Sequence, residues 1–345
     1  MKDEDSKKRK ASNPQKDDKA EKAKDPSKGG AAPVKEAKAP SKDEPATPAN
    51  TGLLSKLKFP ELPVNQAIGI PLAILVIALL ITGFTMLTAG TPLHLGVDFT
   101  GGTLVTITTD HTDAQLHTEF ASYPVNLISD NGNGQKSIRF DTMSVSQQEA
   151  LSKYVDEHYP GSSLQHTGST ISAANQLQAV GAIAIAFIGM AITIFIIFRN
   201  VIPSVAVITS AFSDIMIAIA LMNLFHIELS FGTFAALLML IGYSVDTDIL
   251  LTTKVLGERK YIDKKIASVR ATGLTMTIAA IAAFLVLHIF STYDFVLGLA
   301  PITVLSAIST VMIFGLLADI MNTWFLNAGL LKWYMGTPEA KAKYG

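Results

Sequence analysis

The 345-residue sequence contains no cysteine, and it has long stretches without a single charged residue. The lack of cysteine excludes a disulfide framework and every cysteine-ligated metal site. The sequence also has no glycine-rich phosphate loop, no metal-ligand spacing in a plausible setting and no nucleophile motif, which argues against ATP-binding and hydrolytic proteins. We therefore expect no enzymatic activity, no cofactor and no bound metal. Any energy source should be an ion gradient or a partner protein.

Residues 1–58 contain almost no aromatic or large apolar residues. They hold fifteen Lys or Arg against ten Asp or Glu, so the near-zero net charge of the chain conceals a basic N-terminal segment. Such a composition cannot bury enough apolar surface to offset the entropy of ordering, and we expect a disordered tail. Contact with anionic lipid or RNA is one alternative. The interspersed acids favour a solubilising tail instead, and we expect no nucleic-acid partner.

Apolar residues make up 49% of the chain and are concentrated in six runs. A helix needs about twenty apolar residues to cross a hydrocarbon core about 30 Å thick. The runs therefore predict six transmembrane helices, at about residues 68–89, 177–198, 201–225, 231–253, 271–290 and 295–330. The last run is long for one crossing, so we expect it to tilt or to bend near Pro301. Residues 53–62 precede the first run, and we expect them to lie at the membrane interface. The interfacial part from residue 59 and the first transmembrane helix should together occupy residues 59–89.

The distribution of positive charge predicts the orientation in the membrane. The connection 254–270 holds six Lys or Arg, whereas residues 90–172 hold three against nine acids. We expect both termini, including a tail at 333–345, and the 254–270 loop to be cytoplasmic. Residues 90–175 should lie outside the cytoplasm, and the chain should be a multi-pass protein of the cell membrane. Helices two to six and their loops would occupy residues 176–332.

The outer segment reads as a small α+β domain. Four stretches have the alternation or the turn flanks of β-strands, at residues 103–109, 125–128, 137–140 and 163–171. An NGNG turn separates the second from the third. Two capping boxes open helices between the strands: Thr112 with Gln115, and Ser144 with Gln147. The order βαββαβ predicts a ferredoxin-like domain, inserted between helices one and two of a six-helix membrane protein.

Four aspartates interrupt the apolar runs: Asp214, Asp246, Asp248 and Asp319. An ionised Asp at the centre of a membrane helix costs about 2.5–3.5 kcal/mol, and no Lys or Arg lies deep in a run to neutralise one. We therefore expect these side chains to face the bundle interior and to load and release protons or bind a cation. In the alternative interpretation, Asp214 and Asp319 only hydrogen-bond to neighbouring helices, and Asp248 reaches interfacial water.

Asp246 and Asp248 are two residues apart, so on a regular helix they point about 200° away from each other. They cannot both face one partner unless the helix is irregular, and we prefer Asp246 as the titrating group because it is deeper in the span. His226 and His288 lie at the outer ends of their spans, where a proton could enter. Histidines are also common at such interfaces, and this alternative stays open.

Directly after the first span, residues 94–103 read HLGVDFTGGT. This segment strongly resembles the signature of the SecF family of protein-export membrane proteins, and its Phe-Thr pair resembles SecF rather than its partner SecD. The fourth span contains a second match, in residues 241–246. The resemblance covers about residues 55–335. It assigns motif and hinge positions to Gly96, Asp98, Phe99, Thr100, Gly101 and Gly102, and span-four motif positions to Gly242, Tyr243 and Ser244.

The resemblance implies that this chain is one half of a resistance-nodulation-division-type assembly, in which SecD is the other half. Such an assembly uses the proton-motive force, or sodium in some relatives, to help preproteins move outward through the SecY channel. Gly101 and Gly102 would then be a flexible joint. The position of the bacterial span-four acid is Thr247 here, with an acid on either side, which resembles the archaeal branch. Archaea lack the SecA motor, so coupling to a cytoplasmic power stroke does not follow.

Two other functions fit the same residues. A stand-alone proton-coupled exporter of small hydrophobic molecules would need a wide apolar cavity and a second six-span unit, and no internal repeat is present. A passive translocon scaffold would need the acids only for helix packing. The leading interpretation is the SecF-like translocase subunit, with SecD, SecY, the preprotein and the lipid bilayer as partners.

Overall fold

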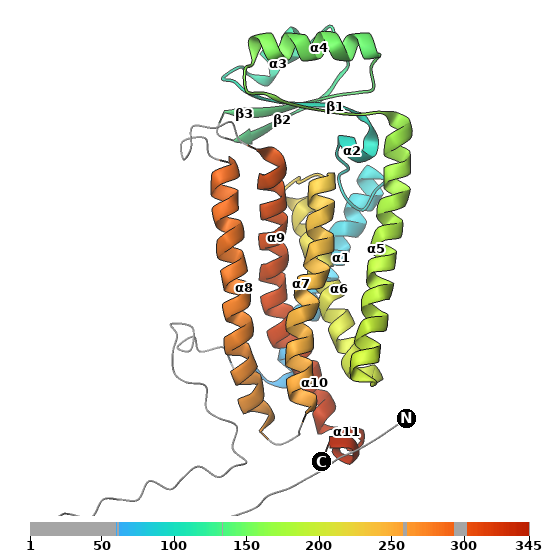
Figure 1. The fold of residues 1–345 in the computed structure, drawn as a ribbon, viewed down its shortest axis with the longest axis vertical. Helices are drawn as coiled ribbons and strands as arrows, with labels where there is room; N and C mark the ends of the chain where they lie inside the picture. Colours follow the sequence, from blue (N-terminus) through green and yellow to red (C-terminus); the bar gives the residue numbers. More distant parts are fainter. Residues whose placement is uncertain (1–59, 61, 133, 258–260, 293–301, 345) are drawn as a thin grey trace, which may run out of the picture. The chain divides into compact units, whose positions relative to one another are not determined.

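The computed structural model describes residues 60, 62–132, 134–257, 261–292 and 302–344. The tail predicted for residues 1–58 and the bend predicted near Pro301 lie outside the described residues, as does most of the predicted interfacial segment. Within the described part, a helix bundle and a small sheet domain are present (Figure 1). This confirms the coarse fold class expected from the sequence.

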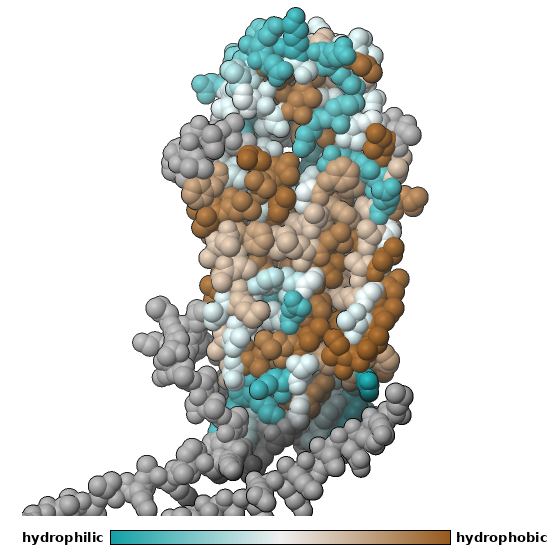
Figure 2. All heavy atoms as spheres, in the orientation of Figure 1, coloured by the Kyte–Doolittle hydropathy of each residue, from teal (hydrophilic) through white to brown (hydrophobic). Residues whose placement is uncertain are grey.

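Six helices in the described part of the chain are long and apolar enough to cross a membrane, as predicted. They are α1 (Val64–Ala89), α5 (Ser169–Phe198), α6 (Val201–Leu224), α7 (Phe231–Leu256), α8 (Ile262–Thr292) and the continuous run of α9 (Thr303–Met321), η3 (Asn322–Asn327) and α10 (Ala328–Gly336). A last short helix, α11, covers Pro338–Tyr344. Figure 2 shows apolar side chains covering most of the bundle surface, with paler and teal residues interrupting them about halfway along this face.

Several helices extend beyond their predicted bounds. Helix α7 ends at Leu256 and α8 begins at Ile262, so most of the connection predicted at 254–270 is helical. Ile266 and Val269 explain the extension, because both are buried against the bundle and lie three residues apart on one helix face. Helix α5 begins at Ser169, and the strand predicted to run to residue 171 therefore ends at Thr167.

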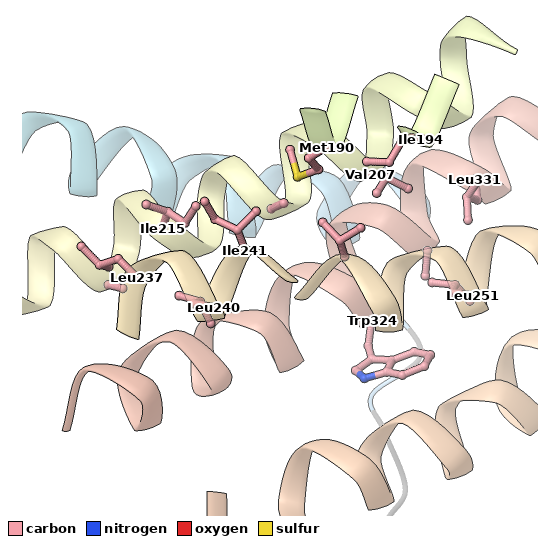
Figure 3. Packing of buried hydrophobic residues seen from close by; sticks show 14 of the residues in the cluster. Met190, Ile194, Val207, Ile215, Leu237, Leu240, Ile241, Leu251, Trp324 and Leu331 are labelled. Atoms are coloured by element: carbon pink, nitrogen blue, oxygen red, sulfur yellow. The ribbon is translucent and has the colours of Figure 1, made fainter. Parts of the chain in front are cut away.

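The bundle core is densest around α6 and α7, the most enclosed of the six helices. Figure 3 shows Leu237, Leu240 and Ile241 of α7 among side chains from α5, α6 and the last span. Two glycines permit close helix contacts. A Cβ on Gly315 of α9 would overlap Leu240, and one on Gly273 of α8 would lie 2.5 Å from the Trp324 ring. The helices can therefore approach closely around the buried centre.

The sheet domain contains β1 (Gly102–Thr108), α3 (Asp113–Glu119), β2 (Val125–Gly132), β3 (Gln135–Phe140), α4 (Val145–His158) and β4 (Ser163–Thr167). The strand order is β2-β3-β1-β4, and every neighbouring pair is antiparallel. Helices α3 and α4 cover one face of the sheet (Figure 1). Among the described residues of this domain, a core is formed by the buried side chains of Val105, Ile107, Leu116, Phe120, Ile138, Phe140, Leu151 and Val155. Both predicted capping boxes are present.

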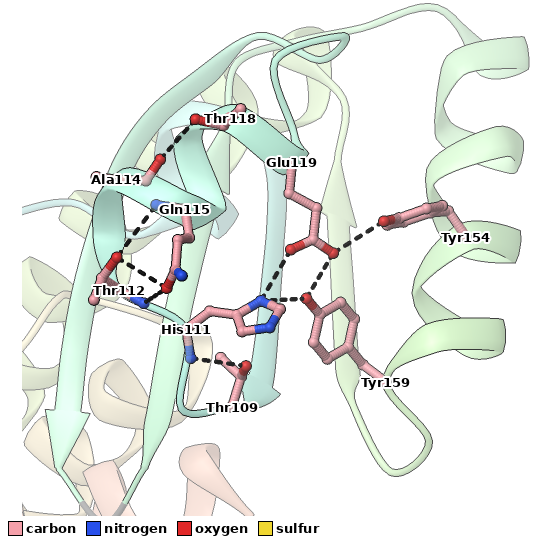
Figure 4. A network of polar contacts seen from close by, with 9 residues as sticks. All are labelled: Thr109, His111, Thr112, Ala114, Gln115, Thr118, Glu119, Tyr154 and Tyr159. Carbon is pink, nitrogen blue, oxygen red and sulfur yellow. Dashed lines mark hydrogen bonds and ion pairs between the residues drawn. The ribbon is translucent and has the colours of Figure 1, made fainter.

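A hydrogen-bond network around Glu119 connects the two helices of this domain (Figure 4). One carboxylate oxygen accepts from the hydroxyl of Tyr154 at 2.9 Å and from that of Tyr159 at 2.6 Å. The other lies 3.1 Å from Nδ1 of His111. Burial raises the pKa of Glu119, but these three hydrogen bonds outweigh that effect, and the net pKa is lowered. The network therefore favours the ionised carboxylate.

Candidate functional site

Three of the four aspartates predicted from the sequence meet inside the helix bundle. Asp214 comes from α6, Asp248 from α7 and Asp319 from α9. None is more than 1% exposed. The three helices pack against one another in the bundle core, so the carboxylates share one polar centre. We refer to these side chains, with the groups that bond to them, as the polar core.

Asp214 is bonded from two sides. The hydroxyl of Ser244, on α7, donates to Oδ2 of Asp214 at 2.5 Å, and Nδ2 of Asn322 donates to Oδ1 at 2.7 Å. Ser244 and Asp248 are four residues apart on α7, and they therefore present neighbouring side chains to the same side of the bundle. The span-four motif thus contributes directly to the polar core through its serine.

Asp248 and Asp319 share one donor. Thr323 Oγ1 lies 2.9 Å from Oδ1 of Asp248 and 3.0 Å from Oδ1 of Asp319, and Asn327 Nδ2 donates to Asp248 Oδ1 at 2.8 Å. A hydroxyl has a single proton, so Thr323 can donate to only one carboxylate at a time. A second bond forms only if one carboxyl is protonated and donates to the Thr323 oxygen. The geometry is therefore suited to a proton that changes places.

A π-helical turn, η3, places the donors of the last span. Asn322 and Asn327 are five residues apart, and in a regular α-helix they would point about 140° away from each other. The i→i+5 hydrogen bonds of a π turn bring residues five apart nearly onto one line, and such turns occur frequently at functional sites. Both amides consequently reach carboxylates on neighbouring helices.

Two carboxylate oxygens of the polar core, Oδ2 of Asp248 and Oδ2 of Asp319, have no hydrogen-bond donor among the described residues. A buried carboxylate oxygen without a donor is costly unless a proton or a cation satisfies it. Within the described part of the chain, no group of three or more His, Cys, Asp or Glu side chains is arranged to hold a metal ion. The expected exchange of protons or of a cation at this centre stays a prediction.

Asp246 does not join the polar core. Its side chain is exposed on α7, whereas Asp248 is completely buried. The predicted divergence of the two acids is thus present. The sequence preference for Asp246 over Asp248, and the alternative that Asp248 reaches interfacial water, find no support in this geometry. Gly242 is also exposed on the same face of α7, four residues before Asp246, and Tyr243 is partly buried.

The motif that follows α1 anchors two spans. It forms a short helix, α2 (Val97–Thr100), in which Asp98 Oδ2 accepts from the backbone N–H of Phe231, the first residue of α7, at 2.9 Å. A carboxylate at a helix N-terminus bonds a free N–H group and interacts favourably with the helix dipole. Phe99 is buried and its ring lies 5.4 Å from that of Phe231. The Thr100 hydroxyl donates to the carbonyl of Gly96 at 3.1 Å.

The same motif also contacts α5 and the loop before α7. Asn175 Nδ2 donates to the carbonyl of Asp98 at 2.9 Å, and Gln176 donates to that of Phe99. The Gly96 N–H donates to the Leu229 carbonyl at 2.9 Å. These bonds extend from the end of α1 to two other spans. The motif therefore connects the joint between α1 and the sheet domain to both α5 and α7.

Gly101 and Gly102 connect α2 to β1 at backbone angles that favour glycine, with φ of 80° and 110°. A Cβ on Gly102 would also overlap the carbonyl oxygen of Phe140 on β3. Both glycines therefore serve the backbone conformation of the joint, and Gly102 also serves a close packing contact with β3. Their predicted flexibility stays a prediction.

The residues that sequence reasoning missed are the donors of the last span. Asn322, Thr323 and Asn327 are polar residues in an otherwise apolar run, and that polarity was the available signal. Asn322 falls three residues after Asp319, a spacing that places both on one helix face. Asn327 could not be placed by helical periodicity, because its position depends on the π turn.

Two protein families match the sequence. Residues 147–337 match the family described as protein export membrane protein SecD/SecF, C-terminal, and residues 87–113 match the SecD/SecF GG motif. The first match covers the five later spans, including the whole polar core. The second covers α2 and the paired glycines.

Named relatives are similar over most of their length. The chain is 44% identical over 270 residues to the protein-export membrane protein SecF of Haloferax volcanii, which is 78% of this chain and 92% of that protein. It is 41% identical to SecF of Methanolacinia petrolearia, over 79% and 94% of the two chains. It is 38% identical to SecF of Pyrococcus furiosus, over 81% and 94%.

One solved structure has a similar fold. It is the crystal structure of SecDF, a translocon-associated membrane protein from Thermus thermophilus, with a TM-score of 0.65 and 18% sequence identity. The match covers 83% of this chain and 40% of that one, so this chain spans less than half the length of that protein. At this identity the likeness concerns the fold alone.

Proposed function

The chain belongs to the SecD/SecF family of protein-export membrane proteins, and on that premise we propose that it is a SecF-type accessory subunit of the Sec protein translocase. It works with SecD and uses an ion gradient, the proton-motive force, to promote the export or release of preproteins that pass through SecY. The polar core is the observation that carries this proposal.

In the proposed cycle, a proton or cation loads onto the carboxylates and leaves toward the other side of the membrane. Asp214, Asp248 and Asp319 belong to three different helices, so a change of charge on any of them alters the hydrogen bonds between helices. Thr323 would reorient its single proton between Asp248 and Asp319. Helix α7 would transmit the rearrangement to the joint through the bond between Asp98 and its first N–H group.

The exposed face of α7 supports the proposed pairing with SecD. Asp246 lies on this face within a candidate membrane span. A charged side chain facing lipid costs about 2.5–3.5 kcal/mol, and such residues usually face other protein or a water-filled space. Gly242 on the same face leaves room for a second helix to approach closely. We assign this face, with Asp246 at its centre, to the contact with SecD.

The orientation expected from positive charge belongs to the same proposal. The termini lie in the cytoplasm, and residues 90–175 lie outside the cell membrane, where an emerging preprotein would be met. The strand order β2-β3-β1-β4 in a βαββαβ chain supports the ferredoxin-like classification of the sheet domain.

The test is export by vesicles that contain this chain, SecD and the translocon, measured with and without an imposed ion gradient. Asn is nearly the same size as Asp and can still accept a hydrogen bond, but it cannot exchange a proton or hold a negative charge. The double variant Asp214→Asn with Asp319→Asn, and the single variant Asp248→Asn, should therefore lose the gradient-stimulated part of export. The gradient-independent part should remain.

The matched control is Asp263→Asn, which removes an exposed carboxylate that pairs with Lys332 outside the polar core. It should export like the unmodified chain. Protease protection of residues 90–175 in every variant reports insertion and orientation. Gradient-stimulated export that persists undiminished in the correctly inserted double and single variants would refute ion coupling and favour a passive scaffold.

A further inference from the structure

A cavity of about 440 Å³ lies between the sheet and the outer ends of the bundle. We call it the outer cavity. The face of the sheet opposite α3 and α4 contributes Leu104, Leu127, Ser137 and Arg139, and the loop between α6 and α7 contributes residues 225–228. The ends of α8 and α9 supply mostly hydroxyl groups: Ser291, Thr292, Thr303, Ser306 and Thr310. Its volume is large enough for several water molecules.

The hydroxyl groups lead from the outer cavity to one histidine. His288 Nδ1, on α8, lies 3.2 Å from the Thr310 hydroxyl, 3.3 Å from that of Ser309 and 3.5 Å from that of Ser306. Ser306 also lies 2.7 Å from the hydroxyl of Thr292. Ser306, Thr310 and Thr292 line the cavity, whereas Ser309 is completely buried. The chain of hydroxyls thus enters the bundle from outside.

Beyond this cluster, α9 becomes apolar until it reaches the polar core. Thr310 and Asp319 are nine residues apart, about 14 Å along the helix axis. Met312 and Leu316 are buried between them, and Leu240 of α7 packs against Gly315. A proton or water molecule cannot cross such a closely packed apolar segment without a rearrangement. The outer hydroxyl chain and the polar core are therefore separated in this conformation.

An ion pair connects the sheet to the loop beneath it. Arg139 of β3 contacts the carboxylate of Glu228, in the loop between α6 and α7. Burial raises the pKa of Glu228, although the positive charge of Arg139 acts in the opposite direction. Both residues line the outer cavity. The pair therefore holds the sheet over the ends of the helices.

We propose that the outer cavity is the external entrance of the ion path, that it delivers protons to His288 through the hydroxyls of α8 and α9, and that the sheet domain, held by Arg139 and Glu228, covers it. This inference rests on the proposed function. It adds to it by naming where the ion enters and how movement of the outer domain changes access to the path.

The groups around His288 favour a proton over a metal cation. Its described hydrogen-bonding partners are three hydroxyls, which can accept or donate a proton in turn, and no carboxylate is among them. The ionisable groups that line the cavity are Asp130, Arg139, His226 and Glu228. A hard cation would instead require several oxygen ligands of negative charge at short range.

The absence of cysteine from the chain allows a direct test of the entrance. Single variants Ser306→Cys and Thr310→Cys, in intact vesicles oriented with residues 90–175 outward, are treated with a negatively charged, membrane-impermeant thiosulfonate. The reagent reacts with thiolates in water, so both cysteines should be modified. Two control cysteines on α9 should resist: Met312→Cys, which is buried, and Leu317→Cys, which is 53% exposed on the bundle surface.

The cover is tested by adding Glu228→Gln to Ser306→Cys. Loss of the ion pair should raise the modification rate about tenfold, because the sheet leaves the cavity more often. Leu317→Cys should be unaffected by the same change. If Ser306→Cys and Thr310→Cys react no faster than Leu317→Cys, the cavity is not an aqueous entrance. A modification rate that Glu228→Gln leaves unchanged would contradict the covering role of the sheet.

These measurements involve no export and no gradient, so they separate the two proposals. Unmodified cysteines at 306 and 310 would overturn the entrance while leaving the export test of the polar core intact. Conversely, undiminished export in the Asp→Asn variants would overturn ion coupling whatever the labelling shows, and the claim that the cavity delivers protons would fall with it.

Discussion

Replacement of Gly102 by alanine tests why the paired-glycine motif needs its second glycine. Gly102 begins β1 with φ of 110°, and a Cβ there would overlap the Phe140 carbonyl on β3. An L-residue at such a positive φ costs about 1–2 kcal/mol. Forcing an additional carbon into a packed contact costs about 1–3 kcal/mol more. We therefore expect Gly102→Ala to weaken the β1–β3 pair by about 2–5 kcal/mol.

Hydrogen–deuterium exchange of the full chain in lipid nanodiscs measures this effect locally. At the lower limit of 2 kcal/mol, amides in residues 102–108 and 135–140 should exchange about 30-fold faster. Gly90 provides a matched control, because it also has a positive φ, 74°, but a Cβ there would meet nothing within 4 Å. Gly90→Ala should cost only about 1–2 kcal/mol at the end of α1, and leave the sheet unchanged.

The reasoning would be wrong if Gly102→Ala left exchange in β1 and β3 as it is in the unmodified chain. It would also be wrong if Gly90→Ala accelerated exchange in those strands equally, since the contact with Phe140 would then not be the cause. Either result would exclude the close contact with Phe140 as the reason for glycine at position 102.

Two further predictions concern the sheet domain and the polar core. The pKa of Glu119 is lowered from 4.5, so its network stabilises the domain above about pH 4.5, and this contribution is lost as the pH falls through the lowered value. In a pH series of near-ultraviolet circular dichroism, Glu119→Gln should therefore reduce the loss of domain stability at acid pH. If the variant lost stability at acid pH as the unmodified chain does, the network would be excluded as the source of that loss. Asn327→Leu removes a donor to the buried Asp248 and should destabilise the bundle by about 1–3 kcal/mol in thermal unfolding. The control Thr193→Val removes an exposed hydroxyl that is bonded within its own helix, and it should change the unfolding free energy little. Equal losses of stability in the two variants would contradict the assigned bond between Asn327 and Asp248.

Local signals in the sequence predicted most of the fold. The capping boxes at Thr112 and Ser144 placed α3 and α4 because a side chain bonded to the N3 backbone fixes a helix start within the segment itself. The long apolar runs predicted the spans because the length of an apolar run is likewise a property of the segment itself. The N-terminal starts of α5 and α8 were not predicted, because tertiary contacts extend these helices. Asn175 and Gln176 of α5 bond to the motif after α1, and Ile266 of α8 packs into the bundle.

The candidate site was partly predictable for a different reason. The cost of a buried charge identified Asp214 and Asp319 without any knowledge of the fold. The choice between Asp246 and Asp248 depends on which side of α7 faces the bundle, and depth along the span does not determine that rotation. The large buried residues of α7 do determine it: Leu240, Val245 and Leu251 share the face of Asp248 and not that of Asp246. Asn327 depended on a π turn, which no local pattern announced.

The two acids of span four differ in a way that follows from the helix itself. Two residues separate them, and that spacing on a regular helix directs one carboxylate into the bundle and the other out of it. Asp248 meets donors from the last span, while Asp246 lies on a surface that an isolated chain would leave to lipid. A carboxylate that faces lipid makes the isolated chain less stable in the membrane, and this cost is removed when another protein covers that face. Under the proposed function, helix α7 would join ion binding to assembly, because a change of charge at Asp248 would alter the packing of the helix that also presents Asp246 to the proposed SecD contact.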